Sequence, residues 1–199
     1  MEVLDRRRIW VVLVLLAMSC GRVHGAQTPS QKKPPVNQDS LVIASFENNI
    51  KEYVKLHNKA KAGIPPLKPT DSANAINQEQ RVLASRIREA RPEATQGAIF
   101  TPEISLVFKR LIGSTMQGPD AAKIRASLRR AEPLPEIKLR VNAEYPERLP
   151  LQSSPPSVLA NLPQLPPELD YRIVGRDLVL RDVGANLVVD FIPNAIPST

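Results

Sequence analysis

Residues 169–192 read LDYRIVGRDLVLRDVGANLVVDFI, and this stretch decides the fold. It holds three short runs of aliphatic and β-branched residues, at 169–174, 178–182 and 187–192. Turn residues around Gly175 and Gly184 separate the runs, and such a pattern favours consecutive antiparallel strands. The sequence therefore predicts a three-stranded antiparallel meander that occupies the C-terminal region 169–199.

The last run of this meander is apolar on both sides. In an extended strand, Leu187, Val189 and Phe191 point to one face, and Val188 and Ile192 point to the other. Both faces of the sheet therefore need cover from other parts of the chain. We expect the meander to pack against helices that the preceding sequence supplies.

Four segments between residues 41 and 132 have the spacing of helices with one buried face, because their apolar residues recur at three- and four-residue steps. Typical helix starts precede them. These are Asp39 or Ser40 for the first helix, Asp71 or Ser72 for the second, Thr101 with Pro102 for the third, and Pro119 with Asp120 for the fourth. The region 41–132 is thus predicted to be a small irregular helical bundle.

The stretch 133–168 differs in composition, because nine of the protein's 20 prolines fall within it. This density of proline excludes a long helix and favours an extended segment. Within it, residues 137–141 alternate apolar with basic side chains and predict one short edge strand, and residues 154–159 predict a single helical turn. The predicted fold class is therefore α+β, with a small irregular helical bundle, a proline-rich segment and a C-terminal three-stranded antiparallel meander.

The first 25 residues have the layout of a secretory signal peptide. Three arginines at 6–8 precede a run of ten apolar residues at 9–18, and Gly25 followed by Ala26 offers small residues for cleavage. A run of this length falls well short of the roughly 20 residues needed to cross a bilayer. We expect export to the periplasm or the medium, with cleavage between Gly25 and Ala26.

Residues 26–40 follow the predicted cleavage point and lack apolar periodicity, so they are predicted to form a disordered tether. The single cysteine, Cys20, lies directly after the apolar run of the signal. One interpretation is that Cys20 is removed with the signal, and the other is that it carries a lipid anchor. Membrane contact is expected only with a lipid on Cys20 or with a retained signal.

Without the signal the chain has no cysteine, so disulfides, a catalytic thiol and cysteine-based metal sites are excluded. Removing the signal's four arginines and two acids from 27 basic and 20 acidic residues leaves a net charge of about +5. Candidate anion-binding residues are Arg81, Arg88, Arg125 and Arg129. A solvated helix face is the alternative interpretation of these four arginines.

Such a basic patch suits anionic lipid, polysaccharide or an acidic protein surface. Nucleic acid is not an expected partner, because the tyrosines do not alternate with the basic residues as a base-stacking surface requires. The sequence also lacks glycine-rich phosphate loops and the serine elbow of hydrolases. No cofactor is therefore expected.

His57 is the only histidine beyond the signal, and its lysine-rich helix indicates a surface or packing residue. One histidine without further ligands predicts no metal site. Four aspartates in the meander, at 170, 177, 182 and 190, are interleaved with arginines at 172, 176 and 181. We interpret this pattern as cross-strand ion pairs, with a catalytic acid pair as the alternative.

Two resemblances are carried by longer stretches. The stretches YVKLHNKAKAGIPPLKPT, GAIFTPE and YRIVGRDLVLRDVGANLVVDFIPNAIP together resemble a family of uncharacterised exported bacterial proteins, a resemblance that spans most of the chain after the signal. The segment LPPELDYRIVGRDLVLRDVGANLVVDFI is similar to the closing meander of periplasmic nickel/cobalt-homeostasis proteins. The first resemblance implies no activity, and the second implies only the local fold.

These observations favour a non-enzymatic protein of the cell envelope that acts as an interaction or accessory module for another envelope protein. One alternative is a hydrolase of cell-wall or polysaccharide substrate that uses aspartate or glutamate. Another is a protein that binds anionic lipid or another polyanion through the basic helices. A deep cleft with two close carboxylates would favour the hydrolase, and salt-sensitive binding would favour the polyanion binder.

Overall fold

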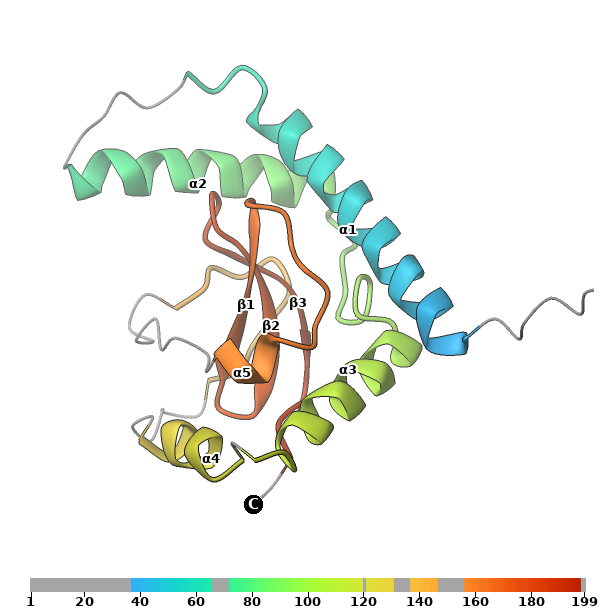
Figure 1. Cartoon of the computed structure of the whole chain (residues 1–199). Helices are drawn as coiled ribbons and strands as arrows, with labels where there is room; N and C mark the ends of the chain where they lie inside the picture. Colours follow the sequence, from blue (N-terminus) through green and yellow to red (C-terminus); the bar gives the residue numbers. More distant parts are fainter. Residues whose placement is uncertain (1–36, 66–71, 120, 131–136, 147–155, 198–199) are drawn as a thin grey trace, which may run out of the picture. The chain divides into compact units, whose positions relative to one another are not determined.

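Helices precede strands along the chain, and the fold is α+β (Figure 1). The computed structural model describes residues 37–65, 72–119, 121–130, 137–146 and 156–197, all within one unit that begins at Val36. The predicted signal, Cys20, the cleavage point between Gly25 and Ala26, and most of the predicted tether lie outside the described residues. The described elements are α1 (Gln38–Lys61), α2 (Ala73–Ala90), α3 (Pro102–Thr115), α4 (Ala121–Arg130), α5 (Pro156–Leu159), β1 (Leu169–Val174), β2 (Asp177–Asp182) and β3 (Leu187–Ile192).

The first helix begins three residues before its predicted start. Asn37 is its N-cap, and the Asn37 side chain accepts a hydrogen bond from the Asp39 N–H at 3.1 Å. Residues 38–40 are therefore helical rather than part of the predicted tether, and neither Asp39 nor Ser40 is the cap. After Lys61, Gly63 adopts a φ of +76°, a backbone conformation that glycine adopts without steric cost.

Two of the other predicted helix starts are confirmed. The Ser72 side chain caps α2 by accepting from the Ala75 N–H at 3.4 Å, and Thr101 caps α3 by accepting from the Ile104 N–H at 3.4 Å. Pro102 occupies the first turn of α3, where its missing N–H costs no helical hydrogen bond. The predicted single helical turn is α5. None of the described helices is long and apolar enough to cross a bilayer.

The predicted meander is confirmed as an antiparallel sheet with the strand order β1-β2-β3. A two-residue turn that contains Gly175, at a φ of +61°, joins β1 to β2. The turn between β2 and β3 ends in Asn186, which has a φ of +49°. Asparagine tolerates this left-handed conformation better than other residues with a β-carbon do, so the turn needs no second glycine there.

The prediction of an edge strand over residues 137–141 is wrong. The chain pairs with β3 slightly later, through the Asn142 N–H to the Val188 carbonyl and the Tyr145 N–H to the Asn186 carbonyl, at 2.9 and 2.8 Å. Asn142 has a φ of +62°, so the backbone bends where the predicted strand would continue. The alternation of apolar and basic side chains over residues 137–141 shows which side chains are half-buried. It does not show which strand the backbone of this segment pairs with.

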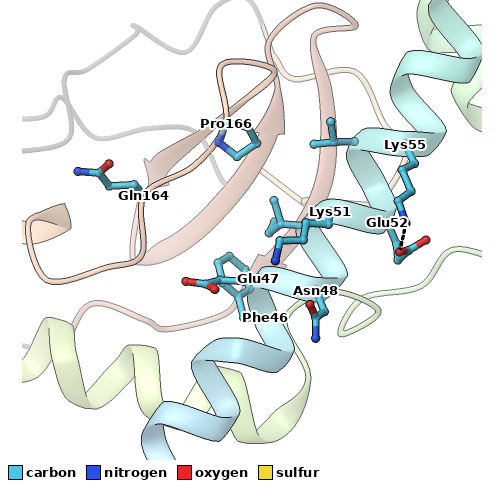
Figure 2. A pocket seen from close by; sticks show the side chains of 10 residues that line it. Phe46, Glu47, Asn48, Lys51, Glu52, Lys55, Gln164 and Pro166 are labelled. Atoms are coloured by element: carbon cyan, nitrogen blue, oxygen red, sulfur yellow. Dashed lines mark hydrogen bonds and ion pairs between the residues drawn. The ribbon is translucent and has the colours of Figure 1, made fainter.

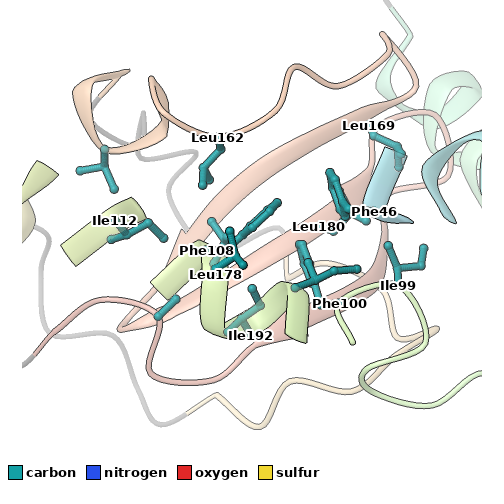
Figure 3. Packing of buried hydrophobic residues seen from close by; sticks show 14 of the residues in the cluster. Phe46, Ile99, Phe100, Phe108, Ile112, Leu162, Leu169, Leu178, Leu180 and Ile192 are labelled. Carbon is teal, nitrogen blue, oxygen red and sulfur yellow. The ribbon is translucent and has the colours of Figure 1, made fainter. Parts of the chain in front are cut away.

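Helices α1 and α3 bury their apolar stripes together with one face of the sheet (Figure 3). Phe46, Phe100 and Phe108 lie with ring centroids 4.9–5.7 Å apart, and Leu178 and Ile192 join them from the strands. A second cluster on the opposite face contains Tyr145, Val174, Val179 and Val188. Both faces of the sheet are therefore covered, as predicted. The predicted grouping of the residues of β3 is wrong, because a bulge in the β2–β3 register at Val189 places Leu187 and Ile192 on the face toward the helices and Val188 and Phe191 on the other.

Candidate functional site

A carboxylate at the end of β2 connects three parts of the fold. Asp182 is fully buried, and its Oδ2 accepts from the Tyr53 hydroxyl at 2.8 Å and lies 2.6 Å from Nδ1 of His57. Its Oδ1 accepts from the Ala185 N–H at 2.8 Å. Tyr53 and His57 lie one helical turn apart on α1, so their side chains leave the same face of the helix. Asp182 thus ties α1 to β2 and to the turn that follows β2.

The imidazole of His57 is sealed by close packing. His57 is only 2% exposed, and a β-carbon on Gly184 would lie 3.3 Å from its Cε1 atom. The same β-carbon would lie 3.4 Å from Cδ2 of Leu83 on α2. The glycine therefore lets the turn between β2 and β3 approach both helices closely. His57 is a packing residue, one of the two expected roles, but its bond to Asp182 was not predicted.

Arg91, the residue after α2, lies beside this cluster. Its guanidinium carbon is 5.2 Å from the centre of the Tyr53 ring, and it donates to the Val189 carbonyl at 3.2 Å. Burial lowers the pKa of the Arg91 guanidinium, while Tyr53 and Asp190 oppose that change. Burial raises the pKa of the Tyr53 phenol far above its ordinary value, and Asp182 adds to this effect. The phenol therefore keeps its proton and donates a hydrogen bond to Asp182.

A second buried carboxylate, Asp190 of β3, holds the loop before α3. Asp190 is fully buried and accepts from the N–H groups of Ile99 and Phe100 at 2.8 Å each, and from that of Gly97 at 2.9 Å. These backbone donors satisfy the buried carboxylate, and the Arg91 guanidinium adds a favourable charge interaction with it. The role of Asp190 is therefore to fix the chain that delivers Phe100 to the core.

Among the described residues, the predicted cross-strand pair with an arginine is present for Asp170, through Arg181, but not for Asp177, Asp182 or Asp190. The pair of Asp170 with Arg172 lies within β1. Asp170 pairs with Arg172 at 2.6 Å and with Arg181 at 3.0 Å. Successive residues of a strand point to opposite faces, and the strand register places Asp182 and Asp190 on the face that the helices cover. They therefore face α1 and the loop before α3, while the arginines of β1 and β2 point to the other face.

The four arginines predicted to bind anions are not gathered in one place. Arg81 donates to the Gln78 side chain at 3.0 Å, Arg88 to the Asn142 carbonyl at 2.8 Å, and Arg125 to the Met116 carbonyl at 3.0 Å. The side chain of Arg129 lies outside the described residues. Helix α2 packs in a cluster with Leu187, whereas Ile124 of α4 packs in the main core. Arg81, Arg88 and Arg125 thus each bond to a group near them and do not form one common anion-binding patch.

A hollow of about 650 Å³ lies between α1 and the segment 163–166 (Figure 2). We call it the α1 groove. Its apolar base is formed by Phe46, Ile50 and Val54, its polar rim on α1 by Glu47, Asn48, Lys51, Glu52 and Lys55, and its other wall by Gln164 and Pro166. Lys55 and Glu52 pair across 2.7 Å on the exposed rim. A second hollow of about 560 Å³ shares Gln164 with the groove and is also lined by Leu159, Ala160, Leu162, Pro163, Leu165 and Tyr171.

Sequence reasoning missed the α1 groove, because the segment 163–166 carried no signal for its position beside α1. The signal that it did carry was proline, which predicts an extended chain without a location. Among the described residues, no group of three or more histidine, cysteine, aspartate or glutamate side chains is placed to hold a metal ion. The chain matches no protein-family model, no curated protein and no solved structure, so the resemblance to exported bacterial proteins stays a prediction.

Proposed function

We propose that this chain is an exported, non-enzymatic interaction module of the bacterial cell envelope that binds a partner protein along the α1 groove. The single observation that carries the proposal is the α1 groove, with its apolar base and charged rim. The burial of His57 and Asp182 bears on the enzyme alternative. A histidine paired with a carboxylate is the usual start of hydrolytic chemistry, and it needs a substrate within hydrogen-bond reach. Here both side chains are sealed in the core and serve to hold α1.

The α1 groove has the composition of a protein-binding surface. Its base is apolar, and its rim on α1 carries both signs of charge, with Glu47 and Lys51 one turn apart and Lys55 paired to Glu52. Protein interfaces combine an apolar centre with a polar rim in this way. A groove with one helix as a wall suits an extended segment that inserts an apolar side chain and matches the rim charges.

The sequence supports the location of this function. A basic start, a short apolar run and small residues before Ala26 form an export signal, and the remaining chain has no cysteine. An exported protein without disulfides depends on packing and buried hydrogen bonds for its stability. The Asp182 and Asp190 clusters supply bonds of this kind.

Site-specific photo-crosslinking in the native envelope tests the proposal. A photoreactive phenylalanine analogue replaces Asn48, which lines the α1 groove, or Gln78, which is exposed on α2 and outside the groove. We expect one reproducible protein adduct from position 48 and none from position 78. Equal adducts from both positions, or none from either, would contradict the proposal. Adducts with lipid or polysaccharide would favour the polyanion binder instead.

A further inference from the structure

We propose that two copies of this chain associate through the outer edge of β1, with a two-fold axis at Tyr171 that joins their sheets. This inference is independent of the α1 groove, since it concerns the main chain of β1. It commits to a second copy as the occupant of the edge. The argument rests on the exposure of β1, on its hydrogen-bonding pattern and on the order of its charges.

The strand β1 forms one edge of the sheet (Figure 1). It is also the least buried of the three strands. Its four middle residues are all partly exposed, whereas five of six residues in β2 and five of six in β3 are buried. The opposite edge of the sheet, at β3, is paired with residues 142–145. The two edges of the sheet therefore differ, and β1 is the edge with room for another strand.

The hydrogen-bonding pattern identifies the outward groups of β1. The Val183 N–H donates to the Glu168 carbonyl at 2.9 Å, so residues 168, 170, 172 and 174 direct their main-chain groups toward β2. Tyr171 and Ile173 consequently direct their N–H and C=O groups away from the sheet. Among the described residues, none forms a hydrogen bond with these four groups.

The residue order of β1 is complementary to itself. In an antiparallel pair with the axis at Tyr171, Asp170 of each copy lies opposite Arg172 of the other, and Leu169 lies opposite Ile173. Opposite charges in such cross-strand positions stabilise a sheet, and like charges destabilise it. A shift of the axis by one residue would place the two Arg172 side chains opposite each other, so the charges select one register.

Two guanidinium groups share one carboxylate on this face of the sheet. Within one chain, a single carboxylate, Asp170, serves the guanidinium groups of both Arg172 and Arg181. Arg181 is nearly buried over the Tyr145 ring, with 5.2 Å between its guanidinium carbon and the ring centre. In the pair of copies, Arg172 of each copy lies between Asp170 of its own chain and Asp170 of the other copy. The ratio of carboxylates to guanidinium groups is unchanged, but each Arg172 gains a second carboxylate as a cross-strand neighbour.

Sedimentation equilibrium of the full chain purified from its envelope tests this inference. We expect a dimer for the natural chain and a monomer for Arg172→Glu, which places two acidic side chains opposite each other. Arg140→Glu is the matched control, because it makes the same change of charge at an exposed position away from β1. We expect this control to remain a dimer.

A mixing experiment separates loss of pairing from loss of folding. Asp170→Lys alone should also be monomeric, because the introduced ammonium group would face Arg172 of the other copy. Mixed with Arg172→Glu, it should form a heterodimer in which both cross-strand pairs carry opposite charges. A natural chain that stays monomeric at its highest soluble concentration would overturn the inference. So would an Arg172→Glu dimer as stable as the Arg140→Glu dimer, or a failure of the mixed variants to associate while both remain folded by circular dichroism.

Discussion

Nδ1 of His57 lies 2.6 Å from Oδ2 of Asp182, although 125 residues separate the two along the chain. The pair connects the C-terminal part of α1 to the end of β2 inside the core. Tyr53 and the turn after β2 bind the same carboxylate. This cluster joins the first helix to the last two strands, and several predictions depend on it.

Removal of the Asp182 carboxylate should destabilise the fold strongly. Asp182→Ala leaves the Tyr53 hydroxyl, the His57 ring and the Ala185 N–H without their acceptor in a buried place. Breaking a buried ionic or polar cluster on one side costs about 3–5 kcal/mol. Urea unfolding followed by circular dichroism measures this loss of free energy.

Asp39→Ala is the control for that measurement, because Asp39 forms an exposed ion pair with Arg110. Exposed pairs contribute about 0–1 kcal/mol. If Asp182→Ala and Asp39→Ala unfold at the same urea concentration, the Asp182 cluster does not hold the fold together.

Gly184 should be intolerant of a β-carbon, while another glycine should accept one. Gly184→Ala places a methyl group 3.3 Å from Cε1 of His57 and 3.4 Å from Cδ2 of Leu83, so it overpacks the core. Overpacking costs about 1–3 kcal/mol. Gly113 is in α3 with nothing within 4 Å of the added carbon. Gly113→Ala should therefore raise stability by up to about 1 kcal/mol.

Thermal unfolding of both glycine variants measures these effects. A change of 1 kcal/mol shifts Tm by about 2–4 °C in a chain of this size. We expect Gly184→Ala to melt below the natural chain and Gly113→Ala to melt above it. A Gly184→Ala variant that melts with or above the natural chain would show that the turn does not press on His57.

Alkaline pH should weaken the fold through its tyrosines. Burial raises the pKa of all three phenols, those of Tyr53, Tyr145 and Tyr171. In the unfolded chain a phenol ionises near pH 10, so above that pH the unfolded state binds fewer protons than the folded state. The free energy of unfolding is unaffected below about pH 10 and then falls by ~1.4 kcal/mol per pH unit for each protected phenol.

Urea unfolding at several values between pH 8 and 12, with phenolate absorbance as a second signal, measures this dependence. Tyr171→Phe removes one protected phenol and should make the fall with pH less steep. Phenolate absorbance that rises near pH 10 while circular dichroism stays native would contradict the predicted protection.

The N-terminus of the protein from its own envelope should be Ala26. Mass spectrometry of the purified chain detects this end directly and also detects any lipid on Cys20. Removal of the signal at Gly25 leaves no cysteine, so Cys20→Ser should not change the release of the protein from membranes. Detection of an N-terminal Cys20 that carries a lipid would contradict this prediction and would show that the protein is lipid-anchored.

The three strands of the meander and the starts of α2 and α3 could be predicted from sequence, because their signals are local. Each signal affects the backbone only within a few residues: a turn at Gly175, and helix starts at Ser72 and at Thr101 with Pro102. Asn37 was missed as a cap because Asp39 and Ser40 are equally good caps by residue type. Which of several possible caps is used depends on how the helix packs against the rest of the fold, and this packing is not visible in the local sequence.

The Asp182 cluster could not be predicted, because its members are far apart in the sequence. The aspartates and arginines of the meander were interpreted together because they are neighbours in the sequence. Strand periodicity sends Asp182 and Arg181 to opposite faces, so that interpretation failed for Asp182 and succeeded for Asp170. Strand periodicity alone therefore predicts that Asp182 and Arg181 do not pair. It does not predict that Asp182 bonds to His57 and Tyr53 on α1.

The most direct test of the account compares crosslinking from position 48 in two further variants, with yields expressed per folded molecule. Asp182→Asn changes the buried cluster, and Lys51→Glu changes the rim of the α1 groove. The account predicts that Asp182→Asn lowers stability but keeps the partner adduct, whereas Lys51→Glu keeps stability and loses the adduct. An adduct lost with Asp182→Asn and kept with Lys51→Glu would contradict it, because the buried cluster would then serve function rather than structure.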